Sequence, residues 1–290
     1  MVASGKRLHL RPRPLPLPYG VSFTLRKYPP CPALRPYVEC YYLLRGATDR
    51  QSGSRELFLP DGAAEMVFHY GLTSSGDGAD DPVRKVIGQL TRPLEVHVRG
   101  RGHSFGIWFR PAGLAYFTDL AASELTDTVV STYALFPQAF VNALDRRLAG
   151  GRVSAAIRYL EAYLLRLLTQ RTPTKRDYLV NALIDRYPYA VREQVTLAAL
   201  AEEYGVSVRY LQVAFKRMCG LTPRQFVTIA QFSEAVATLH ALGEKQLTEV
   251  AYACGYYDQA HFIRSFRRLS GRTPSAFLRS ASPLAHLFLA

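Results

Sequence analysis

The pattern of apolar and polar positions first predicts strands. From residue 21 to about residue 109, segments rich in β-branched and aromatic residues alternate with turn residues such as Pro60-Asp61-Gly62 and Arg99-Gly100-Arg101-Gly102. The expected strands cover residues 38–44, 56–59, 65–70, 83–87, 94–98 and 105–109. Several short strands at this spacing are typical of a small β-barrel or sandwich.

A helical pattern begins near Gly113, where apolar residues recur every three to four positions. It predicts helices over residues 112–120, 137–148 and 153–169. The last helix has an apolar stripe that either packs on the barrel or forms a dimer seam, made of Ile157, Leu160, Leu164, Leu165 and Leu168. The polar residues 170–176 predict a linker, followed by a helix over 177–187 and a turn at Pro188.

Two similar patterns follow one another in the last third of the chain. Four positions of the first pattern correspond to positions 51 residues later (266 − 215, for example): Leu211, Phe215, Gly220 and Pro223 match Phe262, Phe266, Gly271 and Pro274. Ahead of the turn the offset is 50 (255 − 205), so the second turn is one residue longer. Each pattern contains a short helix, a turn at glycine and a second helix with one apolar and one polar side. This repetition predicts two tandem helix-turn-helix units.

Helix start and stop signals support these units. Ser207 and Asp258 are suitable N-caps for the second helix of each unit, and Thr248 for the first helix of the second unit. Between the units, Thr222-Pro223 begins a helix that Gly243 ends. We expect this single helix to hold the two units at a fixed separation.

Residues 197–279 resemble the DNA-binding domain of the AraC/XylS family of bacterial transcription regulators. The resemblance is closest in the second unit, which reads ACGYYDQAHFIRSFRRLSGRTPSAF. It implies an all-α domain of two helix-turn-helix units that binds double-stranded DNA in a sequence-specific manner. The expected function is therefore regulation of transcription.

The strand-rich part resembles an N-terminal domain found in one branch of AraC-like regulators, a domain of unknown function thought to have a cupin-like barrel. The matching motifs are Leu59-Pro60-Asp61-Gly62 and Phe109-Arg110-Pro111, and Tyr42 stands where relatives often have Trp. The resemblance implies an effector or oligomerisation domain. The resemblance identifies no ligand. Our hypothesis is that the barrel encloses an apolar pocket in which a small molecule binds.

Together these patterns predict an α+β chain. We expect a flexible leader over residues 1–20 and a cupin-like β-barrel with flanking helices over 21–169. The linker covers 170–176, and an AraC-type DNA-binding domain with two helix-turn-helix units covers 177–290.

The polar side of each second helix predicts the DNA contacts. The candidates for base edges are Arg209, Gln212, Gln259, His261 and Arg264, and the candidates for phosphates are Lys216, Arg217, Arg267 and Arg268. Many relatives have Arg at the positions of Val213, on the polar stripe, and Gln231, in the linking helix. We therefore expect the second unit to dominate the reading of bases.

The charge of the chain favours a polyanionic partner. The net charge is +13 and the pI is about 9.7. From Tyr178 onward there are 12 Lys and Arg against 8 Asp and Glu, so most of the excess lies earlier in the chain. Charge alone therefore does not locate the DNA-binding part.

Other chemistry has little support in the sequence. The four cysteines, Cys31, Cys40, Cys219 and Cys254, lack the spacing of a zinc site, and the paired His-x-His of metal-binding cupins is missing. Glu65 and His69 are four apart on one expected strand, which alone does not make a metal site. No phosphate-binding loop or nucleophile elbow is present. We expect no enzyme, no catalytic residue, no metal and no cofactor. Two alternatives remain open: a cupin-like metal-dependent enzyme, or a ligand-independent regulator, fused to the DNA-binding domain.

The expected partner is double-stranded DNA in the cytoplasm. No apolar run approaches the roughly 18 residues needed to cross a bilayer, and the first 20 residues, broken by four prolines, lack a secretory signal. We expect no membrane contact. A small-molecule effector of unknown identity, a homodimer and a contact with RNA polymerase are further partners that the resemblance leaves open.

Overall fold

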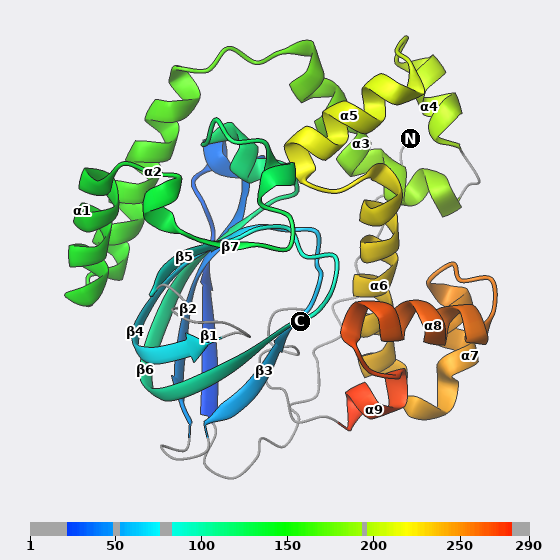
Figure 1. Ribbon diagram of the computed structural model, residues 1–290, viewed down its shortest axis with the longest axis horizontal. Helices are drawn as coiled ribbons and strands as arrows, with labels where there is room; N and C mark the ends of the chain where they lie inside the picture. The colour runs from blue at the N-terminus through cyan, green and yellow to red at the C-terminus, as the bar shows by residue number, and fades with distance from the viewer. Residues whose placement is uncertain (1–21, 49–52, 76–82, 193–195, 280–290) are drawn as a thin grey trace.

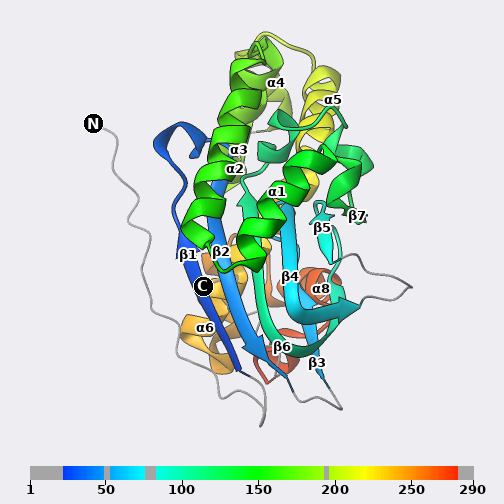
Figure 2. The ribbon, with the colours of Figure 1, turned by 90° about the vertical axis from the view of Figure 1, so that its left-hand side faces the viewer.

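The computed structural model describes residues 22–48, 53–75, 83–192 and 196–279. The predicted leader lies outside these residues. Within them, a β-sheet and the helices that follow it form an α+β structure (Figure 1). The sheet lies between two sets of helices, which come from the middle and from the end of the chain (Figures 1 and 2).

Seven strands form one antiparallel sheet. They are β1 (Ser22–Tyr28), β2 (Val38–Ala47), β3 (Ser54–Phe58), β4 (Glu65–Ser75), β5 (Arg84–Ile87), β6 (Leu94–Phe109) and β7 (Val129–Ser131). Their order is β1-β2-β6-β4-β5-β7, and β3 pairs with the first part of β6. The sequence patterns located β2 to β6 but missed β1 and the three-residue strand β7.

The sheet is open, so the predicted closed barrel is wrong. Within the described residues the two ends of the strand path, β1 and β7, pair with β2 and β5 but not with each other. The predicted turn at residues 99–102 is also wrong, because β6 runs through it as one strand. Gly71 and Gly100 have φ of 71° and 102°, and a Cβ added to Gly100 would lie 2.4 Å from the Gly71 carbonyl oxygen. Glycine thus permits a close, irregular pairing where we expected the chain to reverse.

One face of the sheet packs against two helices, α1 (Gln138–Ala149) and α2 (Val153–Thr169), as Figure 2 shows. Tyr41, Phe68 and Phe105 on this face are fully buried. In α2, Leu160 and Leu164 are also fully buried, and the other residues of the predicted stripe pack against the same core. The apolar stripe therefore packs inside the chain.

The opposite face of the sheet contains buried charge as well as apolar side chains. The Tyr42 hydroxyl donates a hydrogen bond to Glu65 Oε2 at 3.2 Å, and Lys85 is only 4% exposed. Burial, reinforced by the nearby Asp61 carboxylate, raises the pKa of Glu65 to about 8. The hypothesis of an apolar pocket inside a barrel does not fit this face, because Glu65 and Lys85 are buried there.

The rest of the described chain is helical. Its α-helices are α3 (Lys175–Arg192), α4 (Leu197–Glu203), α5 (Val208–Cys219), α6 (Pro223–Leu242), α7 (Leu247–Ala253), α8 (Gln259–Ser270) and α9 (Pro274–Leu278). Short 3₁₀ helices are η1 (Pro32–Leu34), η2 (Gly113–Tyr116), η3 (Ala122–Glu124), η4 (Thr132–Ala134) and η5 (Glu244–Gln246). Two expectations fail: residues 112–120 form only η2, and α3 continues past Pro188 instead of turning there.

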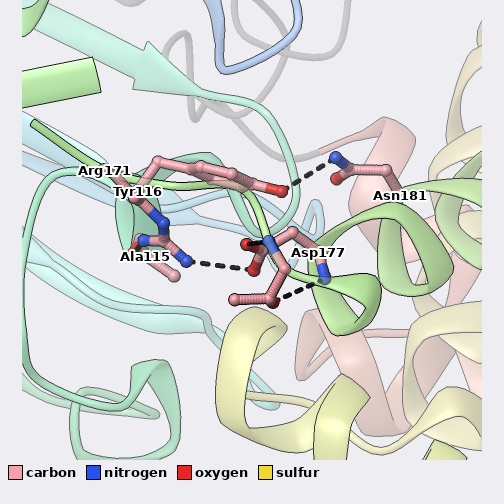
Figure 3. A network of polar contacts seen from close by, with 6 residues as sticks. Ala115, Tyr116, Arg171, Asp177 and Asn181 are labelled. Atoms are coloured by element: carbon pink, nitrogen blue, oxygen red, sulfur yellow. Dashed lines mark hydrogen bonds and ion pairs between the residues drawn. The ribbon is translucent and has the colours of Figure 1, made fainter. Parts of the chain in front are cut away.

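We call the described residues from 22 to 169 the sheet part. Polar contacts at the predicted linker, residues 170–176, join the sheet part to α3 (Figure 3). The Arg171 guanidinium donates to the Ala115 carbonyl at 2.6 Å, pairs with Asp177 at 3.0 Å and lies 4.5 Å from the centre of the Tyr116 ring. Asn181 donates to the Tyr116 hydroxyl at 2.9 Å. We call these residues the Arg171 network. Since Asp177 is only 2% exposed, its charge depends on Arg171 for compensation.

Substituting Arg171→Ala should destabilise the chain by about 3 kcal/mol, because it leaves the buried Asp177 carboxylate without its cation. Urea denaturation measures the change. Arg55→Ala is the matched control, since Arg55 is 82% exposed and pairs with Glu95 at 3.8 Å in solvent. Equal stability of the two variants would contradict the role given to Arg171.

The raised pKa of Glu65 predicts that stability falls as pH rises. The folded chain keeps this proton between about pH 4.5 and 8 while the unfolded chain releases it, so the folded state loses up to about 1.4 kcal/mol per pH unit there. Glu65→Gln should flatten that dependence in urea denaturation between pH 6.5 and 8. An unchanged slope would show that Glu65 is ionised in the folded chain.

Candidate nucleic-acid interface

We call α4 and α5 the first helix pair. Gly205, with φ of 63°, follows α4, and the Ser207 side chain accepts a hydrogen bond from the Tyr210 N–H at 3.1 Å, as an N-cap should. Leu211 and Phe215 are fully buried. Gly220, with φ of 76°, ends α5 in the left-handed conformation. The polar side of α5 therefore faces away from the core.

The second helix pair, α7 and α8, repeats this arrangement. Asp258 Oδ1 accepts a hydrogen bond from the His261 N–H at 2.6 Å, and Gly271 ends α8 with φ of 71°. The predicted cap at Thr248 is wrong, because Gln246 precedes α7 and no side chain caps it. The Thr248 hydroxyl instead donates to Gln259 Oε1 at 2.9 Å. This bond ties α7 to the beginning of α8.

Helix α6 connects the two pairs. Thr222 and Gln225 form a capping box at its beginning, and Gly243 ends it, as the sequence predicts. Phe226 packs on Phe215 of α5 with ring centres 5.4 Å apart, and Phe232 packs on Phe266 of α8 at 5.1 Å. A helix of this length, 20 residues, extends about 30 Å.

All nine predicted contact residues are exposed. In α5 these are Arg209, Gln212, Lys216 and Arg217, and in α8 they are Gln259, His261, Arg264, Arg267 and Arg268. Within the described residues, no salt bridge joins the six cationic Arg and Lys side chains among them to a carboxylate. Their donors are therefore available to an anionic partner.

Two exposed tyrosines near the second pair were missed. Tyr257 is 85% exposed and Tyr252 is 64% exposed. The Val206 N–H donates to Ala201 O, and the Tyr256 N–H donates to Ala251 O in the same way, so Val206 and Tyr256 correspond. The cap Ser207 follows Val206 directly, whereas Tyr257 stands between Tyr256 and the cap Asp258. Tyr257 is therefore the additional residue of the second turn. The change of offset from 50 to 51 was the sequence signal for it. A tyrosine hydroxyl at such a position can donate to a phosphate.

The sheet part offers no comparable chemistry among the residues that the structure describes. There, no group of three or more His, Cys, Asp or Glu side chains could hold a metal ion. His69 Nδ1 lies 2.7 Å from Ser104 Oγ, and burial lowers the pKa of His69 to about 3. None of the four cysteines, which all lie within the described residues, forms a disulfide. Among the described helices, none combines the length and apolarity that a membrane span requires.

Two protein-family models match separate parts of the chain. Residues 26–131 match the model described as a domain of unknown function (DUF6597), and residues 200–280 match the model of a helix-turn-helix domain. The second match covers both helix pairs except the beginning of α4.

The curated relatives match about a third of the chain. The HTH-type transcriptional activators RhaS of Salmonella schwarzengrund and Salmonella paratyphi B are each 33% identical over 95 residues. This match covers 33% of this chain, which spans about a third (34%) of the length of those relatives. The resemblance to AraC/XylS regulators is thereby confirmed.

Solved structures with a similar course include ToxT from Vibrio cholerae O395. The TM-score is 0.43 at 8% identity, over 89% of this chain and 97% of that chain. The same protein bound to (E)-4-(8-methylnaphthalen-1-yl)but-3-enoic acid gives a TM-score of 0.39 at 9% identity, over 89% of this chain and 98% of that one.

The cap of α8 gives a testable prediction. Asp258→Ala removes the acceptor for the His261 N–H and should lower stability by about 1 kcal/mol in urea denaturation. Asp258→Asn is the control, because asparagine caps about as well without the charge. If both substitutions destabilise equally, the carboxylate charge, and not the cap, is what α8 requires.

Proposed function

We propose that this chain, an AraC/XylS-type protein in its C-terminal region, is a sequence-specific DNA-binding regulator of transcription. The observation that carries the proposal is the exposed polar stripe on α5 and again on α8, each with cations that no described carboxylate neutralises. A helix with a buried apolar side and such an outer side has the form that enters a major groove.

Both helix pairs act as helix-turn-helix units in this proposal. The matched caps at Ser207 and Asp258, and the matched ends at Gly220 and Gly271, support their equivalence. Since α6 extends about 30 Å, it can span roughly one turn of duplex, about 34 Å. The two reading helices would then meet successive major grooves on one face of the DNA.

The contacts divide into two classes by their place along each helix. Residues near the beginning of a recognition helix reach base edges, and those further along meet the backbone. We assign base edges to Arg209 and Gln212 in α5, and to Gln259, His261 and Arg264 in α8. Phosphates fall to Lys216, Arg217, Arg267 and Arg268, and Tyr257 joins this second class. The Thr248 bond leaves the amide NH₂ of Gln259 free to donate to a base.

The second unit dominates base reading. On the outer stripe of α5, Val213 is 60% exposed and offers a base only apolar contact with a thymine methyl. Helix α8 presents Arg264, which can pair with guanine through two hydrogen bonds, beside His261. Each stripe has one arginine assigned to a base, Arg209 or Arg264, but the stripe of α5 also includes the apolar Val213, so we predict unequal contributions.

We also propose the following division of the chain into domains. Residues 21–169 form the effector or oligomerisation domain, 170–176 the linker and 177–290 the DNA-binding domain. The RhaS relatives named above are transcriptional activators. We therefore propose that this chain activates transcription and that RNA polymerase is its partner. Whether the chain acts as a homodimer is decided by its sedimentation on and off DNA.

Arg264→Ala should weaken binding to the selected site by about 1–3 kcal/mol and relax the preference at one or two base pairs. Arg209→Ala should weaken binding less, because the first unit, whose stripe includes the apolar Val213, contributes less to base reading. Both variants are compared on a randomised DNA library at one salt concentration. If Arg209→Ala erases the selected motif and Arg264→Ala leaves it intact, the first unit is the reader.

Arg268→Gln should weaken binding to all DNA sequences by about the same factor. It should lower the slope of log K against log salt concentration by about one, because one phosphate contact is lost. Arg55→Gln removes the same charge from the sheet part and should leave the slope unchanged. A change in sequence preference with Arg268→Gln at constant slope would place that side chain on a base.

A further inference from the structure

A groove lies at the beginning of α2, where this helix meets strands β1 and β2. It has a volume of about 580 Å³, within the range of small-molecule sites. Among its lining residues, Leu43 and Val153 are apolar and form what we call its apolar floor. Helices α1 and α2 lie on one side of the sheet and α6 to α9 on the other, so this groove is remote from the second helix pair (Figures 1 and 2).

Four arginines line this groove. Arg26 and Arg45 come from the paired strands β1 and β2, and Arg152 and Arg158 come from the beginning of α2. Arg26 pairs with Leu43 and Arg45 with Thr24, so the two strand arginines are diagonal neighbours on one face of the sheet. All four are exposed. Like charges this close repel each other unless an anion is present.

No acidic residue of the described chain balances these four cations. None of the described residues that line the groove is Asp or Glu, and no described carboxylate forms a salt bridge with any of the four. The nearest acid along α2, Glu161, is already occupied: it accepts hydrogen bonds from the Cys31 N–H at 2.7 Å and the Tyr41 hydroxyl at 3.3 Å.

The beginning of α2 adds to the positive potential. Its N-cap residue, Arg152, makes no side-chain capping bond, and the first turn has no acidic residue. The free N–H groups and the helix dipole therefore reinforce the arginines. Tyr28 supports this wall, because the Arg26 guanidinium lies 5.0 Å from the centre of its ring.

We propose that this groove binds a small anion with at least two phosphate or carboxylate groups. Guanidinium groups bind both kinds of group through paired hydrogen bonds, and four of them from two walls match a ligand with more than one such group. The apolar floor receives the carbon skeleton of an organic ligand. This site is separate from the proposed DNA contacts and from the buried Glu65 and Lys85 on the opposite face of the sheet.

Isothermal titration of the full chain with inorganic pyrophosphate and with citrate, at about 0.15 M salt, tests the proposal. We expect saturable one-to-one binding of at least one probe, and the tighter one distinguishes a phosphate ligand from a carboxylate ligand. The double variant Arg45→Gln/Arg152→Gln should weaken that binding at least about tenfold. Saturable binding of neither probe by the unsubstituted chain would overturn the proposal.

The matched control is Arg267→Gln/Arg268→Gln, which removes two charges from α8 instead. It should leave probe binding unchanged while impairing binding to DNA. Equal weakening of probe binding in both double variants would show a general effect of charge and overturn the proposal. Without ligand, the midpoint temperature of thermal unfolding should be no lower for the groove variant than for the unsubstituted chain, because the substitution removes repulsion between the arginines. Should that variant fail to fold, Arg26→Gln/Arg158→Gln provides the same test.

Discussion

The packing of two phenylalanines on α6 is the contact on which the proposed DNA-binding surface depends. Phe215 on α5 and Phe266 on α8 are fully buried, and each meets a phenylalanine of α6. Because the apolar sides of α5 and α8 are fixed in this way, their polar sides must face out. One helix thereby sets the position and orientation of both stripes. Truncating either ring would remove a buried aromatic contact and loosen the corresponding helix on its support.

The sheet part is joined to this arrangement by packing and by polar contacts. Thr126, just after η3, donates a hydrogen bond at 2.7 Å to the carbonyl of Gly220, the residue that ends α5. The Arg171 network fixes the beginning of α3 against η2 (Figure 3). The end of α5 therefore contacts the sheet part, while Phe215 fixes this helix to α6. A change in the sheet part has a direct mechanical path to α5.

The features that could be predicted from the sequence depend on local patterns. Helix α2 has the predicted bounds because its stripe repeats over 17 residues, and α6 because Thr222-Pro223 and Gly243 mark its ends. The exposure of the contact residues follows from the same periodicity. The open sheet could not be predicted, since the course of β6 depends on pairing with β2, β3 and β4. The Arg171 network and the groove at α2 join residues far apart in the chain, which no local pattern relates.

In the proposed complex, α5 and α8 enter successive major grooves on one face of a duplex. Hydroxyl-radical footprinting and guanine-methylation interference, with the full chain on a selected site, test this arrangement. We expect two segments of interference whose centres lie about one helical turn, 10–10.5 base pairs, apart. We also expect backbone protection on the same face. A single segment, or two segments on opposite faces of the duplex, would contradict the claim that α6 holds two reading helices on one face of DNA.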